Sequence, residues 1–293
     1  MVGSNVGPGK SLPANGTIEL RFDHLLLPIS VARQSAIIRQ ANGEIAAAPV
    51  VQYDPAGKTV TLSASDGRPW LESGQYYVLD FITYRPDAGP GGFRTLLGAT
   101  MDPHAASKLG FFATDSVTIN APHISFCRDI EPILTTKCGR CHGGQSPAMA
   151  LQLDSTNGIR ATAIRQLARG SNAGASSTPR AASFGTDMAI IEPHAPGSSW
   201  LMYKVLLASP SSELTVPTSA TCGGDVFDAL VLYANGIPTP LDDRERTVLG
   251  MFVEGAPMPY PVAQIVDATH EAPLTQDELL RMSEWIRDGA SLE

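Results

Sequence analysis

The pattern of apolar residues changes near residue 120, and this change limits what the chain can fold into. Before it, short β-prone segments alternate with turn signals such as Asn42-Gly43 and Asp54-Pro55-Ala56-Gly57. Several short strands separated by turns predict a β-sandwich. We expect strands over residues 17–22, 36–47, 50–62, 75–83 and 111–119.

The second part of the chain has the periodicity and the capping residues of helices. Pro132 stands near an expected helix start, where its missing N–H costs little. A helix is expected over Asp242–Glu254, ending at Gly255. Thr275 and Glu278 have the spacing of a capping box at the start of a last helix.

The composition is that of a loop-rich globular protein. Charged residues make up 17% of the 293 residues, and there are 27 Gly and 23 Pro. The net charge of −8 argues against a nucleic-acid-binding protein. Most of the negative charge falls in residues 121–293, so a partner of this part should be basic or neutral.

No apolar run is long enough to span a bilayer, so we expect no transmembrane segment. The first ten residues have no apolar core and are no signal peptide. We expect a longer exported precursor.

The most specific motif is Cys138-Gly139-Arg140-Cys141-His142. With four Cys and six His in the chain, this spacing is expected by chance about once in a thousand such chains. Two thiols three residues apart can bond to the two vinyl groups of one haem, and the following histidine can bind its iron. Three other interpretations remain: a redox dithiol, a zinc site and a structural accident.

The first part of the chain resembles the bacterial Ig-like domains of the SbsA type. The resemblance rests on I-x-L-x-F at residues 18–22, V-x-Y-D at 51–54, G-x-Y at 74–76 and F-x-T at 112–114. It implies an all-β sandwich over residues 13–120 that spaces or attaches the protein.

The second part resembles single-haem c-type cytochrome domains of the kind fused in bacterial exported proteins. The resemblance rests on I-x-P-I-L-x-x-K-C-x-x-C-H-G at 130–143, L-x-L-D at 151–154, Met258-Pro259, and L-T-x-x-E with W-I-x-x-G-A in 274–290. It departs from the pattern over 209–240. The implied fold class is two-domain: an Ig-like sandwich and a mainly α cytochrome c domain over 121–291.

These observations define a candidate haem site. Cys138 and Cys141 would hold one haem c covalently, and His142 would be the proximal iron ligand. Met258, on the Pro-flanked segment GAPMPYP, is our candidate for the distal ligand. The alternatives for that position are Met149, Met251, Met282, His194 and His270.

Four other residues are expected at the haem pocket. Trp200, Tyr203 and Trp285 could form its wall, although core packing accounts for them equally well. Arg140 could pair with a propionate, or it could be an ordinary surface arginine.

The two remaining cysteines, Cys127 and Cys222, could form a disulfide, since haem c is attached after export. We therefore expect a periplasmic, extracellular or cell-surface location.

The expected function is electron transfer to a redox partner protein, so the chain is more an electron carrier than an enzyme. A first alternative is a haem enzyme or a gas or redox sensor with an open or displaceable distal site. A second is an Ig-like binding module with an auxiliary haem.

Overall fold

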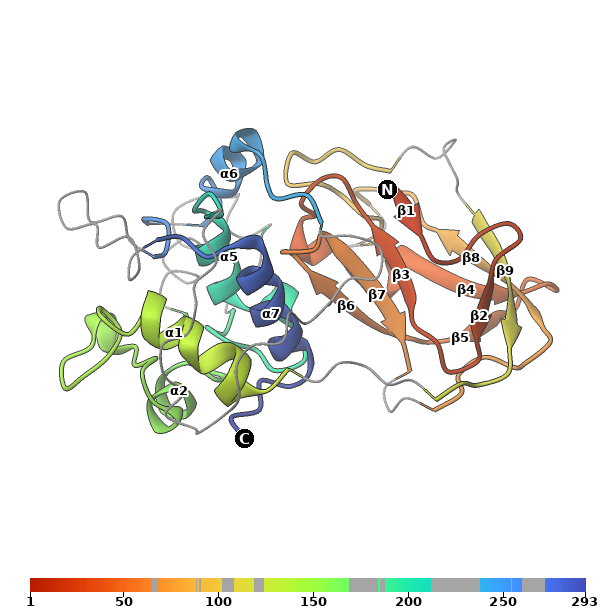
Figure 1. Ribbon diagram of the computed structural model, residues 1–293. Helices are drawn as coiled ribbons and strands as arrows, with labels where there is room; N and C mark the ends of the chain where they lie inside the picture. The colour runs from red at the N-terminus through yellow and green to blue at the C-terminus, as the bar shows by residue number, and fades with distance from the viewer. Residues whose placement is uncertain are drawn as a thin grey trace. The chain divides into compact units, whose positions relative to one another are not determined.

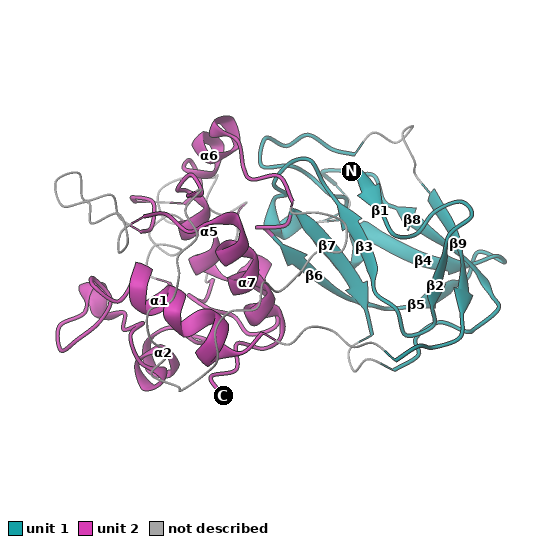
Figure 2. Ribbon diagram, in the orientation of Figure 1, with its two compact units in different colours: residues 1–54, 58–121 teal, residues 55–57, 122–293 magenta. Residues whose placement is uncertain are grey.

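The computed structural model describes residues 1–64, 68–87, 89, 91–101, 108–118, 124–168, 184, 188–211, 238–253, 255–259 and 272–293. The chain forms two compact units (Figure 2). Unit 1 contains residues 1–54 and 58–121, and unit 2 contains residues 55–57 and 122–293.

Unit 1 contains two β-sheets (Figure 1). The first has four strands in the order β1-β3-β7-β6: β1 Gly3–Ser4, β3 Ile18–Arg21, β7 Thr59–Ser63 and β6 Val50–Asp54. The second has five in the order β2-β9-β8-β4-β5: β2 Ser11–Pro13, β9 Lys108–Thr114, β8 Tyr76–Phe81, β4 Ala36–Gln40 and β5 Ile45–Ala47.

Alternating side chains of these strands build the core of unit 1. Ile18 and Leu20 of β3 are fully buried, and so are Ile38 of β4 and Leu79 of β8. The register places Leu20 opposite Val60 and Ile38 opposite Leu79, so buried positions face one another across the strands.

Both predicted hairpins are present. β4 pairs antiparallel with β5 around Asn42-Gly43, where Gly43 has a φ of 88°. This left-handed conformation is the one that favours glycine in such a turn. β6 pairs antiparallel with β7 across the Asp54–Gly57 turn. The parallel pairing of β2 with β9 was not predicted.

The predicted mainly α character of the second domain is wrong, and so is the fold class that rested on it. The described structure is mixed, with two sheets and five short helices: α1 Glu131–Lys137, α2 Thr156–Thr162, α5 Trp200–Leu206, α6 Asp243–Leu249 and α7 Gln276–Arg287. Four have seven residues and α7 has twelve.

The reason for the difference is that turns and single bridges replace much of the expected helix. The helix predicted over Asp242–Glu254 ends at Leu249, and the chain continues from Gly250 in turns. Ile164 and Ile191 form one of several isolated β-bridges that link loops of unit 2. Frequent Gly and Pro limit how far each helix can extend.

The longest helix among the described residues, α7, is largely buried in the core of unit 2, from Glu278 to Ile286. Thr275 accepts from Glu278 N at 3.1 Å and Glu278 accepts from Thr275 N at 2.7 Å, which confirms the predicted capping box. Trp285 of α7 packs on Phe126 with ring centroids 5.7 Å apart. Among the described residues, no helix has the length and apolar character needed to cross a membrane.

Candidate functional site

The CGRCH motif forms a single compact turn at the end of α1. Cys138 caps the helix, and its carbonyl oxygen accepts hydrogen bonds from Cys141 N at 3.2 Å and His142 N at 2.8 Å. Both thiols and the imidazole are thereby held on one short stretch of backbone. Cys138 is half-buried and Cys141 is exposed, and both are free thiols.

The imidazole of His142 is oriented by the loop that follows it. Its Nδ1 lies 3.2 Å from the carbonyl oxygen of Ala148, so the tautomer with a proton on Nδ1 donates a hydrogen bond there. The backbone fixes the same loop, because Ala148 N donates to Cys141 O at 2.8 Å and Leu153 N to His142 O at 2.6 Å. Metal-ligating histidines commonly make such a bond, which leaves Nε2 available to a metal.

Gly143 is required by the close approach of chain segments behind the motif. A Cβ at this position would clash with the carbonyl oxygen of Gly139 and would lie 2.6 Å from Asp154 Oδ2. Asp154 Oδ2 also accepts from Gly144 N at 2.7 Å. The motif is therefore packed tightly against the L-x-L-D segment.

Cys138 and His142 of the motif, but not Cys141, line a cavity of about 430 Å³, which is within the range of small-molecule and cofactor sites. Its walls come from the CGRCH turn, the 149–153 loop, the end of α2, residues 166–168, Ile190, α5 and Met258, and are mostly apolar. The lining residues are Cys138, His142, Met149, Ala150, Leu151, Leu153, Ala161, Thr162, Gln166, Leu167, Ala168, Ile190, Trp200, Leu201, Lys204, Val205 and Met258.

Of the four further residues predicted at the pocket, the structure places only Trp200 in the cavity wall. Tyr203 is buried, with its hydroxyl donating to Gly197 O at 2.7 Å. Trp285 is buried on Phe126 and donates to Ser291 O at 2.7 Å. Arg140 is exposed and does not line the cavity. The core-packing interpretation therefore fits Tyr203 and Trp285.

Two methionines line the cavity, Met258 and Met149. Met149 is 72% exposed, has a φ of 56°, and follows the residue that contacts His142 Nδ1. Met258 comes from a separate segment whose backbone is bonded to α5, since Met258 N donates to Lys204 O at 3.1 Å.

Of the other candidates for the distal position, those that the structure describes do not line the cavity. Met251 is 52% exposed, and Met282 is fully buried in α7. His194 is exposed, with Nδ1 3.3 Å from Arg287 O. His270 lies outside the described residues.

The Cys138 thiol does not have the lowered pKa that favours a reactive redox dithiol. Burial raises the pKa of the Cys138 thiol from 9.0 to about 12, and the Glu278 carboxylate and then Cys141 add to the effect. A reactive dithiol needs a lowered pKa instead. Cys127 is disulfide-bonded. Its predicted partner Cys222 lies outside the described residues, so their pairing stays a prediction.

A zinc site has no support in the described part of the chain. No group of three or more His, Cys, Asp or Glu side chains is placed there to hold a metal ion. A structural zinc site needs four such ligands. A histidine–methionine pair is a different kind of site and would not form such a group.

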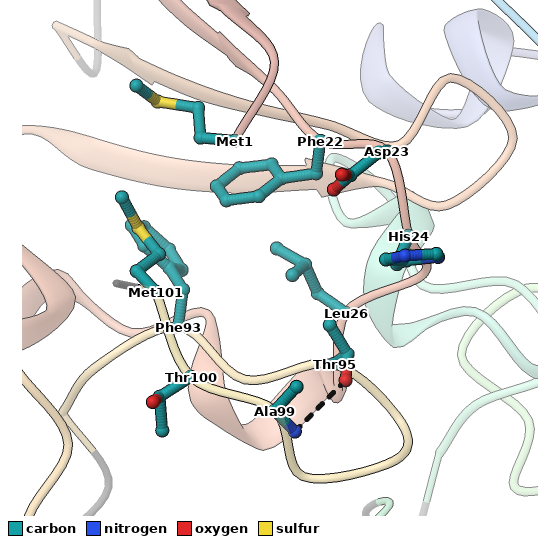
Figure 3. Close-up of a pocket in the computed structure, with 10 residues that line it drawn as sticks. All are labelled: Met1, Phe22, Asp23, His24, Leu26, Phe93, Thr95, Ala99, Thr100 and Met101. Carbon is teal, nitrogen blue, oxygen red and sulfur yellow. Dashed lines mark hydrogen bonds between the residues drawn. The ribbon is translucent and has the colours of Figure 1, made fainter. Parts of the chain in front are cut away.

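Unit 1 contains a smaller pocket of about 230 Å³ (Figure 3). Phe22 and Phe93, with ring centroids 5.3 Å apart, form an apolar wall together with Leu26. Asp23 and His24 lie at its exposed side. All three apolar wall residues are at least 94% buried, which leaves little surface for a ligand. The cavity of unit 2 is therefore the stronger candidate.

Several cavity residues were not identified as site residues from the sequence. Leu151 and Leu153 belong to the quoted L-x-L-D segment, so that motif carried a usable signal. Lys204 could also have been identified from the sequence, because it is the only charged residue within the otherwise apolar stretch 200–207. Gln166 and Ile190 had no local signal, because only the folded loops bring them to the cavity.

The chain matches no protein family and no curated protein. Among solved structures, it is similar to the crystal structure of the S-layer protein rSbsC(31-844), with a TM-score of 0.28 and 15% identity. The similar part covers 40% of this chain and 14% of that chain. A similarity this low carries no argument about fold or function.

Proposed function

We propose that unit 2 binds one haem covalently through Cys138 and Cys141, with His142 and Met258 as axial iron ligands, and that the protein is an electron carrier. The observation that supports this most strongly is the composition of the cavity. Cys138 and His142 line the same apolar cavity as Met258, although about 120 residues separate them in the sequence.

The cavity residues fit the proposed group. A haem is large and mostly apolar, and the lining residues are mostly apolar, including the accessible side chains of Met149 and Leu167. The donor set also fits, because two thiols, an imidazole and a thioether are the attachment and ligand groups of c-type haem. When bound, haem supplies one-electron chemistry between ferric and ferrous iron.

Each part of the chain has a separate task in this proposal. Cys138 and Cys141 attach the group, and the bond from His142 Nδ1 to Ala148 O holds the imidazole in one orientation. With a haem bound, the apolar walls would limit the access of water and lower the local dielectric constant, which would favour the less charged ferrous state.

Met258 is a better distal candidate than Met149. Met149 lies on the loop that contacts the Nδ1 side of His142, which is the side away from a bound iron. Met258 is attached to α5 on separate backbone. Methionine–histidine ligation raises the reduction potential, which suits an electron carrier.

The proposal extends to partner and compartment. A redox partner with a basic or neutral surface would complement the negative charge of residues 121–293. Attachment of haem c after export, together with a disulfide at Cys127, supports a periplasmic or cell-surface location.

The test uses protein produced with a cytochrome c maturation system. Intact mass should show one covalent haem in the wild type and none in the Cys138→Ala/Cys141→Ala variant. Visible spectra should show sharp reduced c-type bands and a weak ferric methionine–iron band. Met258→Ala should lose that weak band, whereas the matched variant Met149→Ala should keep it.

Two results would contradict parts of the proposal. A wild-type protein without covalent haem would remove its basis. A high-spin wild-type spectrum, or one that Met258→Ala leaves unchanged, would contradict ligation by Met258 and favour an enzyme or sensor with an open distal site.

A further inference from the structure

We propose that Lys204 is a positioning residue that holds the Met258 segment against the cavity. This inference deepens the proposed function, because Met258 is the distal ligand only in that proposal. It rests on two hydrogen bonds from one α5 residue to a short segment distant in the sequence.

Lys204 lies on the face of α5 that lines the cavity. Residues 200, 201, 204 and 205 all line the cavity, as expected for one face of a helix. Lys204 is half-buried, and it is the one position of this face that has a charged side chain. An apolar residue would pack there equally well, so the ammonium group needs another explanation.

Two hydrogen bonds link Lys204 to the segment that contains Met258. Its Nζ donates to Ala256 O at 2.6 Å, and its carbonyl oxygen accepts from Met258 N at 3.1 Å. Among the described residues, these are the hydrogen bonds that reach the segment 255–259. Lys204 thus holds the backbone at Met258 and two residues before it.

The segment 255–259 itself has few hydrogen-bond donors. Pro257 and Pro259 have no N–H, so the segment Gly-Ala-Pro-Met-Pro can make few backbone hydrogen bonds. Gly255 has a φ of 87°, and a Cβ there would lie 3.4 Å from Lys204 Nζ. A segment with few donors depends strongly on the bonds that Lys204 provides.

The direct test is amide hydrogen exchange at Met258, which needs no assumption about haem. Lys204→Met removes the ammonium donor and keeps an unbranched apolar side chain. Exchange at Met258 should become about tenfold faster, the change expected from loss of a charge-assisted hydrogen bond. Lys204→Arg keeps a charged donor and should restore slow exchange.

The matched control is Lys10→Met in unit 1, because Lys10 Nζ also donates to a backbone carbonyl oxygen, that of Ser4. This variant should leave exchange at Met258 unchanged. Unchanged exchange in Lys204→Met would overturn the proposal. Faster exchange throughout α5 would also overturn it, because Lys204 would then support the helix and not the segment.

The haem-loaded protein provides a second readout. Lys204→Met should keep its covalent haem but lose at least half of the ferric methionine–iron band, and its ferrous form should bind CO faster. Lys204→Arg should regain the band. If the wild type has no such band, the proposed ligation fails, while hydrogen exchange still decides the role of Lys204.

Discussion

Breaking the buried ion pair between Asp129 and Arg281 should strongly destabilise unit 2. Asp129 is 1% exposed and Arg281 is 3% exposed, and Arg281 Nη1 lies 3.1 Å from Asp129 Oδ1. Asp129 Oδ2 also accepts from Ser125 N at 2.8 Å and from Arg128 at 2.8 Å. The pair links the π-helical turn Phe126–Ile130, directly before α1 and its CGRCH motif, to α7.

Asp129→Ala should lower the free energy of unfolding of unit 2 by about 3 kcal/mol. Removing one partner of a buried pair typically costs about 3–5 kcal/mol, because the other charge stays buried without compensation. The lower end applies here because Arg281 Nε keeps its bond to Asp277 at 2.5 Å. For a unit of this size, the midpoint of thermal unfolding should fall by roughly 6–12 °C.

Urea denaturation and calorimetry measure this change directly. The control is Asp243→Ala, whose carboxylate is 97% exposed in its pair with Arg246 and should contribute less than about 1 kcal/mol. In the double variant Asp129→Ala/Arg281→Met, the buried guanidinium charge of Arg281 is removed as well. The double variant should therefore be more stable than the sum of the single effects implies, by about 1–3 kcal/mol. A loss below 1 kcal/mol in Asp129→Ala, or strictly additive effects, would refute the reasoning.

Four further predictions concern the candidate site and the residues that support it. Gly143→Ala should destabilise unit 2 by about 1–3 kcal/mol in urea denaturation and lower the yield of haem attachment, because the new Cβ would clash with Gly139 O. The control Gly250→Ala should not destabilise unit 2, because its Cβ would lie 3.5 Å from the nearest atom. In haem-free protein, the free energy of unfolding should fall as pH rises from 9 to about 12, because the Cys138 thiol loses its proton at a lower pH in the unfolded state than in the folded state. The fall should be smaller in Cys138→Ser. Glu278→Gln should lower the pKa of Cys138 and speed its alkylation at pH 10, and an unchanged rate measured by mass spectrometry would contradict this. Thr275→Ala should lower the free energy of unfolding by about 1 kcal/mol in a thermal unfolding experiment, because the N-cap hydrogen bond of α7 is lost.

Local features were predicted well because their causes lie within a few residues. The hairpin at Asn42-Gly43 follows from a turn that only a few residues adopt easily. The α7 capping box follows from two side chains three residues apart. The lengths of the other helices were not predicted, because turns and bridges to distant loops compete with helix for the same residues.

The sequence by itself determined the chemistry available to this protein: two thiols and an imidazole on one turn, and a methionine between two prolines. Only the tertiary structure decided which residues share a cavity. It placed Trp200 and Met258 there, packed Tyr203 and Trp285 elsewhere, and brought in Lys204 from an apolar helix. The physical reason is that side-chain identity is local, whereas a cavity wall is formed by segments that contact one another only after folding.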